Sequence, residues 1–191
     1  MKDKIKNIFK ESVKANESFI VDNAEIVERA ALAIAGAFKS GHKLLLAGNG
    51  GSAGDAQHIS GEFLNRFLKE RPPLPGIALT TDSSTITAIG NDYSFDEIFS
   101  KQVKALGNEG DIFFGISTSG GSKNIILAVE EARAKGMMTI GLLGRDGGVL
   151  RELVDLAIIV PVRHTPRIQE VHIIIEHTIC ELVDDILFPD M

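Results

Sequence analysis

The chain has 191 residues, a length that fits one domain of ordinary size. Hydrophobic residues make up 44% and charged residues 24% of the sequence, as in globular proteins with a sizeable core. The formal net charge of -6 argues against a nucleic-acid partner, because a phosphate backbone requires a basic surface. It does not exclude a phosphorylated small molecule, which needs only a few local donors.

The N-terminus and the single cysteine indicate a soluble protein of the cytoplasm. Four of the first six residues are charged, and the segment lacks the apolar stretch of a signal peptide. The longest apolar runs, such as 44–47, are far shorter than the ~20 residues that span a membrane. Cys180 has no second cysteine to pair with and stands among apolar neighbours, so we expect a buried structural thiol. No membrane partner is expected.

Residues 1–39 form a predicted N-terminal helical arm. They contain no proline, and apolar residues recur at helical spacing. Val21-Asp22-Asn23 is typical of a helix start, so we predict two helices with a break near 16–23. An arm of this kind packs on another subunit or on its own domain, and the sequence leaves both alternatives open. The apolar positions are Ile5, Phe9, Val13, Ile26, Ala30, Ala33 and Phe38.

Residues 40–191 alternate short apolar runs with helical stretches, which predicts one α/β core domain. Strands that alternate with helices imply right-handed crossovers and a parallel sheet covered on both faces. We therefore expect a doubly wound, five-stranded parallel sheet of flavodoxin-like order, within a single domain spanning 1–191. The predicted strands are 43–47, 76–79, 111–116, 139–143 and 156–160. The predicted helices are 52–68, 85–89 with 96–106, 121–135, 149–154 and 167–187.

Two loops at the expected ligand-binding edge of this sheet have the composition of phosphate-binding loops. The glycine loop, residues 48–54, reads Gly-Asn-Gly-Gly-Ser-Ala-Gly, and the serine loop, residues 117–122, reads Ser-Thr-Ser-Gly-Gly-Ser. Ligands bind beyond the carboxyl ends of the strands in such sheets, where glycines permit close approach and helix N-termini attract anions. A plain strand-to-helix turn explains the glycine loop equally well. The four hydroxyls of the serine loop favour a small phosphomonoester, since both Walker A and dinucleotide patterns are absent.

Histidines and carboxylates on two predicted helices form a candidate metal site. His58 and Glu62 are four residues apart and share one helix face. The last helix carries Gln169, His172, Glu176 and His177. A His–carboxylate–His set from two helices suits Zn²⁺ with room for substrate oxygens, although such residues also occur on solvated helix faces. The spacing does not decide between the two histidines of the last helix.

Several motifs together resemble the phosphoheptose isomerases, which have the SIS (sugar isomerase) fold. The serine loop by itself indicates only an SIS domain, whereas the Asp-Ala-Gln-His and Arg-Ile-Gln-Glu motifs in combination are more specific. The resemblance covers nearly the whole chain, in order and with similar spacing. The matching segments are Gly48-Asn49-Gly50-Gly51-Ser52, Asp55-Ala56-Gln57-His58, Gly90-Asn91-Asp92, Gly115-Ile116-Ser117-Thr118-Ser119-Gly120, Asp146-Gly147-Gly148 and Arg167-Ile168-Gln169-Glu170-Val171-His172.

The resemblance implies a homotetrameric isomerase with one zinc ion per subunit. Its reaction converts sedoheptulose 7-phosphate to D-glycero-D-manno-heptose 7-phosphate, the first step of bacterial heptose biosynthesis. The sequence leaves open whether the heptose enters lipopolysaccharide, a capsule or another glycan. The implied zinc ligands are His58, Glu62, Gln169 and His177, which selects His177 over His172 by resemblance. The implied substrate contacts are Asn49, Gly50, Gly51, Ser52, Glu62, Arg66, Asn91, Asp92, Ser117, Thr118, Ser119, Ser122 and Gln169.

One departure from the family and one rival function bear on this interpretation. Many members have an acidic residue three positions before the motif's glutamine, where this chain has Pro166, so we expect no acidic contact from that position. The rival is a non-catalytic SIS scaffold that binds the bacterial replication initiator and has similar loops and a similar ending at 185–189. That scaffold lacks counterparts of Glu62 and His177, whose presence here favours the enzyme.

The expected chemistry moves a proton between C1 and C2 of the sugar through an enediol. Glu62 is the predicted catalytic base for the carbon-bound proton, and His177 is the predicted catalytic acid/base for the oxygens. Zinc would polarise the carbonyl. The serine loop would anchor the phosphate and contribute binding energy remote from the reacting carbons.

Overall fold

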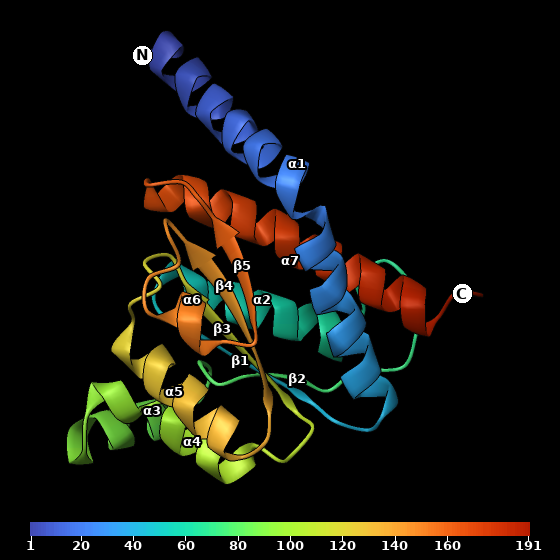
Figure 1. Cartoon of the computed structure of the whole chain (residues 1–191), viewed down its shortest axis with the longest axis vertical. Coiled ribbons are helices and arrows are strands. Elements are labelled where there is room, and N and C mark those ends of the chain that lie inside the picture. The colour runs from blue at the N-terminus through green and yellow to red at the C-terminus, as the bar shows by residue number, and fades with distance from the viewer.

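Five parallel strands form the centre of the computed structural model, which describes residues 1–191 (Figure 1). Their order is β2-β1-β3-β4-β5, and every neighbouring pair is parallel. The predicted doubly wound sheet of flavodoxin-like order is therefore confirmed. The strands are β1 (Leu44–Gly48), β2 (Gly76–Ala78), β3 (Ile112–Ser117), β4 (Met138–Gly144) and β5 (Leu156–Val160).

The helices cover both faces of the sheet and agree with most of the predicted ranges. Strand boundaries and the bounds of α5, α6 and α7 lie within two residues of prediction. The predicted stretch 96–106 is a short 3-10 turn, η1, followed by a separate helix. The helices are α1 (Lys2–Lys39), α2 (Gly51–Leu64), α3 (Ser83–Asp92), η1 (Phe95–Glu97), α4 (Ser100–Leu106), α5 (Lys123–Ala134), α6 (Leu150–Leu153) and α7 (Thr165–Leu187).

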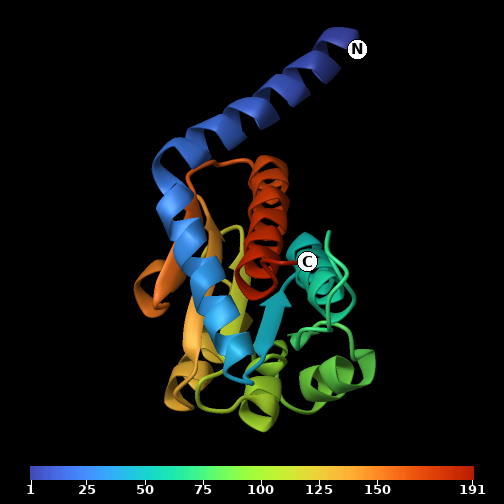
Figure 2. The ribbon, with the colours of Figure 1, turned by 90° about the vertical axis from the view of Figure 1, so that its right-hand side faces the viewer.

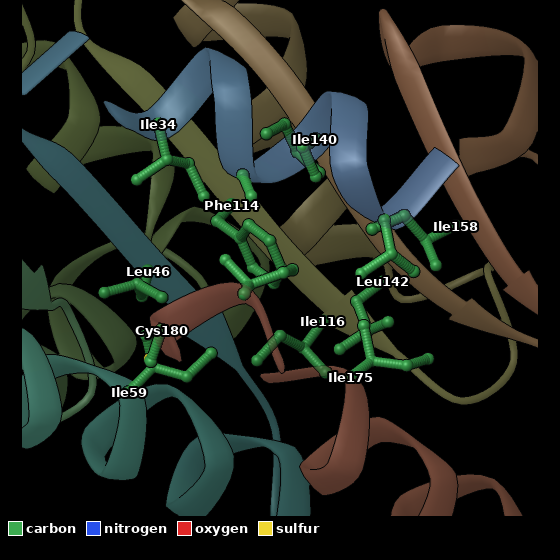
Figure 3. Close-up of a cluster of buried hydrophobic side chains, with 14 of the residues drawn as sticks. Ile34, Leu46, Ile59, Phe114, Ile116, Ile140, Leu142, Ile158, Ile175 and Cys180 are labelled. Carbon is green, nitrogen blue, oxygen red and sulfur yellow. The ribbon is translucent and has the colours of Figure 1, made fainter. Parts of the chain in front are cut away.

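Alternating side chains of the buried strands divide the core into two clusters, one on each face of the sheet. In β3, Phe114 and Ile116 point toward α1, α2 and α7, whereas Phe113 points to the opposite side, toward α4 and α5. Strand residues alternate between faces, so a strand buried on both sides is apolar throughout. The larger cluster includes Ile175 and Cys180 of α7 (Figure 3). The predicted buried thiol is thus confirmed, and burial raises the pKa of Cys180.

The arm is a single helix, so the predicted break at 16–23 is wrong. The side-chain amide of Asn16 donates to the carbonyl of Ser12 at 2.9 Å, and that of Asn23 donates to the carbonyl of Phe19 at 2.8 Å. Both asparagines thus bond back into the helix they were expected to interrupt. The helix bends partway along, and its N-terminal part projects beyond the domain (Figure 2). Its C-terminal part packs on its own domain, with Ala31 and Ile34 fully buried.

Two other helix boundaries differ from prediction for local reasons. Helix α2 ends at Leu64 and not at 68, because the guanidinium of Arg71 takes up the carbonyls of Glu62 and Phe63 that a longer helix would have bonded internally. Helix α3 begins at Ser83 because the carboxylate of Asp82 caps it. None of the helices combines the length and the apolar character that crossing a membrane requires.

Candidate functional site

The glycine loop carries the chain from β1 into α2 at the carboxyl edge of the sheet. A Cβ at Gly48 would overlap the backbone of Ser52, so the turn can close only with glycine at this position. Gly50 has φ +57°, a conformation that side chains disfavour. A Cβ at Gly51 would overlap the amide nitrogen of Gln169, which places this α7 side chain directly against the start of α2. The glycine loop and the Gln169 side chain are therefore in direct contact.

The serine loop is held closed by its own hydroxyls. The Oγ atoms of Ser117 and Ser122 lie 2.9 Å apart, and the backbone N–H of Gly120 donates to Ser117 Oγ at 3.1 Å. The amides of Asn49 and Asn124 exchange two hydrogen bonds, of 2.9 and 2.8 Å, which tie the glycine loop to the first turn of α5. The two predicted phosphate-type loops are thus linked through the first turn of α5, and together they are called the rim below.

Three predicted site residues converge between α2 and α7. The Nε2 atoms of His58 and His177 lie 2.8 Å apart, and His58 Nε2 lies 3.3 Å from Glu62 Oε1. One donor atom from each residue lies within 4.8 Å of the other two. Phe67 packs beside His177, with the ring centroids 5.3 Å apart. This group, His58, Glu62 and His177, is called the His–Glu cluster below.

The other histidine of α7 lies outside the cluster. His172 is fully buried, and its Nε2–H donates to the carbonyl of Leu143 at 3.2 Å. Burial lowers the pKa of His172 to about 4, more than the hydrogen bond to Leu143 restores, so the ring is neutral at pH 7. The geometry therefore gives His172 a structural place and His177 a place in the site, an assignment that spacing alone did not make.

The carboxyl groups of buried Glu176 and partly buried Asp55 interact electrostatically, an interaction that sequence reasoning missed. Burial raises the pKa of Glu176 to about 9, and the negative charge of Asp55 adds to this shift. Burial also raises the pKa of Asp55 to about 6, although the nearby His58 lowers it in part. Glu176 is therefore protonated at pH 7. The spacing of Asp55 three residues before His58 was the only sequence signal that it points toward the same region.

Arg71 joins the two helices that carry the cluster. Its buried guanidinium donates from Nε to Asp184 of α7 at 2.8 Å, and from Nη2 to the carbonyl of Glu62 in α2 at 2.8 Å. Nη1 donates to the carbonyl of Phe63 at 2.7 Å. The sequence contains no signal for this contact, because Arg71 and Asp184 are 113 residues apart.

Two predicted substrate residues, Asn91 and Asp92, lie on a helix apart from α7. Asn91 and Asp92 are exposed at the end of α3 and contact each other, with Asn91 Nδ2 donating to Asp92 Oδ1 at 2.8 Å. Both views place α3 apart from α7 (Figures 1 and 2). Arg66 is half exposed and pairs with Glu70 at 3.4 Å. Pro166 is an exposed residue in the first turn of α7, a position where proline suits a helix.

The donor set of the His–Glu cluster fits a divalent transition metal. Two imidazole nitrogens and a carboxylate oxygen are ligands that Zn²⁺ takes in catalytic sites, with a further position left for substrate. The two Nε2 atoms face each other, as they would when both bind one cation. Gln169 belongs to α7, and its side-chain amide packs against Gly51 at the start of α2, so it lies between the same two helices as the cluster.

Comparison with known proteins gives consistent matches. The SIS domain family matches residues 8–144. A phosphoheptose isomerase from Thermodesulfovibrio yellowstonii is 52% identical over 188 residues, covering 98% of this chain and 94% of the relative. One from Aneurinibacillus thermoaerophilus is 50% identical, covering 98% of this chain and 96% of the relative. The structure of a phosphoheptose isomerase from Francisella tularensis superposes with a TM-score of 0.93 at 45% identity, covering 96% of this chain and 97% of that one.

Proposed function

The chain belongs to the phosphoheptose isomerases of the SIS domain family, and on that basis we propose that it is an aldose–ketose isomerase. The proposed reaction converts sedoheptulose 7-phosphate to D-glycero-D-manno-heptose 7-phosphate. This reaction would be the first step of bacterial heptose biosynthesis. The observation that carries the proposal is the His–Glu cluster, placed beside the rim of two phosphate-type loops. A sugar-phosphate isomerase requires a proton-transfer site close to a site that binds the phosphate.

In the proposed mechanism, the chain's own groups bind the sugar phosphate and move two protons. The hydroxyls of Ser117, Thr118, Ser119 and Ser122 hold the phosphate. The Glu62 carboxylate removes the proton from C1 and returns it to C2, and the enediol lies between these steps. His177 moves the proton between the oxygens on C1 and C2. The interaction of His58 with both residues orients them toward one point.

We propose zinc as the cofactor, one ion per subunit. His58, Glu62 and His177 would hold it together with Gln169, which packs against Gly51 at the start of α2. When bound, the ion would polarise the substrate carbonyl. The support is the donor set, since imidazole and carboxylate ligands suit Zn²⁺.

We also propose that the active form is a homotetramer. The N-terminal part of α1 exposes a row of apolar side chains, including Ile5, Phe9 and Val13, each more than half exposed. An apolar helix face that projects from a domain requires a partner, and closed homo-oligomers use the same patch on each subunit. Because Asn91 and Asp92 lie away from the cluster of their own chain, they would contact substrate only in the site of a neighbouring subunit.

An assay of the purified protein with sedoheptulose 7-phosphate tests the function. We expect formation of the aldose phosphate, loss of turnover with a chelator, and recovery on addition of zinc. A protein that turns over no sedoheptulose 7-phosphate after zinc addition would contradict the proposal. The rival scaffold function predicts that result, together with direct binding to a replication initiator protein in a pull-down.

A further inference from the structure

The turn after β4, residues 145–148, has no role in the mechanism above although its Asp146-Gly147-Gly148 motif stands out in the sequence. Arg145 has φ +61° and is the only non-glycine residue of the chain with positive φ. A side chain in this conformation is strained, because its Cβ crowds the neighbouring backbone. Strain of this kind is concentrated at functional sites in proteins, which makes the turn a place to look for a ligand contact.

Backbone packing fixes this turn against the serine loop. A Cβ at Gly120 would overlap the carbonyl of Gly147, and a Cβ at Gly148 would lie 2.7 Å from the carbonyl oxygen of Ser119. The N–H of Leu150 donates to the carbonyl of Gly120 at 3.0 Å. The two segments therefore contact each other through their backbones. These contacts fix the position of Arg145 relative to the hydroxyls of the serine loop.

A cavity of about 530 Å³ opens where the turn meets the serine loop. Its lining includes Ser119, Arg145 and Arg163, the last from the segment after β5. Neither arginine has an acidic partner or a side-chain hydrogen bond, in contrast to Arg66, Arg71, Arg151 and Arg167, which all have ion pairs. Asp146 also lines the cavity, but its Oδ1 accepts a hydrogen bond from the N–H of Gly148 at 3.1 Å, within the turn.

A phosphate monoester requires charge that the serine loop does not supply. Such a group carries about -1.5 to -2 charges at pH 7, whereas residues 117–122 offer only hydroxyls and N–H groups. The chain's net charge of -6 makes the overall field unfavourable to a dianion. Lys123 follows the loop but does not line the cavity. The cations that do line it are Arg145 and Arg163.

We propose that Arg145 and Arg163 form a cationic subsite that binds the phosphate group of the sugar phosphate beside Ser119. Guanidinium groups form charge-assisted, often paired, hydrogen bonds with phosphate oxygens. The unpaired state of both arginines in this structure leaves their donors available for that purpose. The identification of the anion as substrate phosphate rests on the proposed function, whereas the anion site itself does not.

Binding of inorganic phosphate and steady-state kinetics test the subsite together. Arg145→Gln and Arg163→Gln should each weaken phosphate binding, measured by calorimetry, by about tenfold or more, as for loss of a hydrogen bond to a charged group. KM for the sugar phosphate should rise similarly while kcat stays within about twofold. Arg145→Lys should recover part of the affinity. Arg151→Gln, which removes the same charge from the neighbouring helix α6, should change neither quantity.

Arg145→Gly separates the guanidinium from the backbone strain, because glycine adopts positive φ freely. It should fold at least as stably as the wild type in thermal unfolding yet bind phosphate as weakly as Arg145→Gln. Full phosphate affinity in Arg145→Gly and Arg163→Gln, or no phosphate binding by the wild type, would overturn the subsite. An unchanged KM with weakened inorganic phosphate binding would overturn its assignment to the substrate. A wild type that binds phosphate through Arg145 but isomerises nothing would support the subsite and refute the proposed function.

Discussion

The Nε2 atoms of His58 and His177 lie 2.8 Å apart although the two residues are 119 positions apart in the chain. His58 belongs to α2 and His177 to α7, so their approach depends on the packing of these two helices. Glu62 is one turn further along α2 and contacts the same nitrogen of His58. The proposed chemistry therefore depends on the contacts that hold α2 against α7.

Metal content should follow the geometry of the His–Glu cluster. His58→Ala and His177→Ala should each lower zinc, measured by elemental analysis, from about one ion per subunit to a small fraction, because each variant loses one of the two imidazole ligands of the proposed site. His172→Ala should retain zinc, since His172 bonds to the carbonyl of Leu143 and lies outside the cluster. Loss of zinc from His172→Ala with retention in His177→Ala would show that the two histidines were assigned wrongly.

Removal of the buried guanidinium of Arg71 should destabilise the protein strongly. Arg71→Leu leaves the carboxylate of Asp184 buried without its partner and the carbonyls of Glu62 and Phe63 without a donor. The expected loss is about 3–5 kcal/mol in urea unfolding. Arg66→Leu, which breaks an exposed pair with Glu70, should cost about 1 kcal/mol or less. Equal losses in the two variants would contradict the buried role of Arg71.

The burial of His172 predicts a loss of stability in acid. Its pKa is about 4 in the folded protein against 6.5 ordinarily, so between these values the unfolded chain binds a proton that the folded chain does not. The free energy of unfolding should therefore fall as the pH is lowered from about 6.5 to about 4, by at most about 1.4 kcal/mol per pH unit.

His172→Gln provides the comparison for this pH dependence. Glutamine keeps a donor for the carbonyl of Leu143 but does not titrate, so the variant should lack this part of the pH slope. Glu176 and Asp55, whose raised pKa values act in the opposite direction, are present in both proteins and cancel in the difference. Urea unfolding of both proteins at pH 5 and pH 7 measures this difference in the pH dependence of stability. Identical slopes in the wild type and His172→Gln would exclude a buried neutral histidine.

The sheet and the two loops could be predicted from the sequence because their signals are local. Apolar runs, glycines and hydroxyls are contiguous in the chain, and parallel topology then places the loops at one edge. The continuity of α1 was not predictable by the same approach, because Asn16 and Asn23 are typical cap residues that here bond back into their own helix. Whether the helix breaks or continues at these asparagines depends on their side-chain conformation, which the composition does not reveal.

The site was predictable in its residue types but not in all its contacts. His58 and Glu62 are one turn apart on one helix, as their four-residue spacing in the sequence predicts. The buried pair of Arg71 and Asp184 joins distant segments without a motif, so only the packed structure reveals it. The same holds for the proposed role of Arg145, which depends on the close approach of Gly147 to Gly120.

Shortening the arm should lower the oligomeric state. Deletion of residues 1–13 removes exposed apolar side chains such as Phe9 but leaves Ala15 and Phe19, which are buried in the chain's own core. Light scattering of the intact protein should give about four times the chain mass of 20.6 kDa, and the deletion should lower both this mass and the activity. An intact protein that is monomeric and fully active would contradict the proposed tetramer.

The most direct test of the central claim is the turnover of sedoheptulose 7-phosphate by the wild type, Glu62→Gln and Glu70→Gln, each loaded with zinc. Glu62 lies in the His–Glu cluster, whereas Glu70 is 91% exposed in its side chain and serves as the matched control. We predict that Glu62→Gln folds normally and loses roughly 10²-fold or more in kcat, the scale expected for a general base, while Glu70→Gln keeps wild-type turnover. Near-normal turnover in a zinc-loaded, folded Glu62→Gln protein would contradict the assignment of Glu62 as the base.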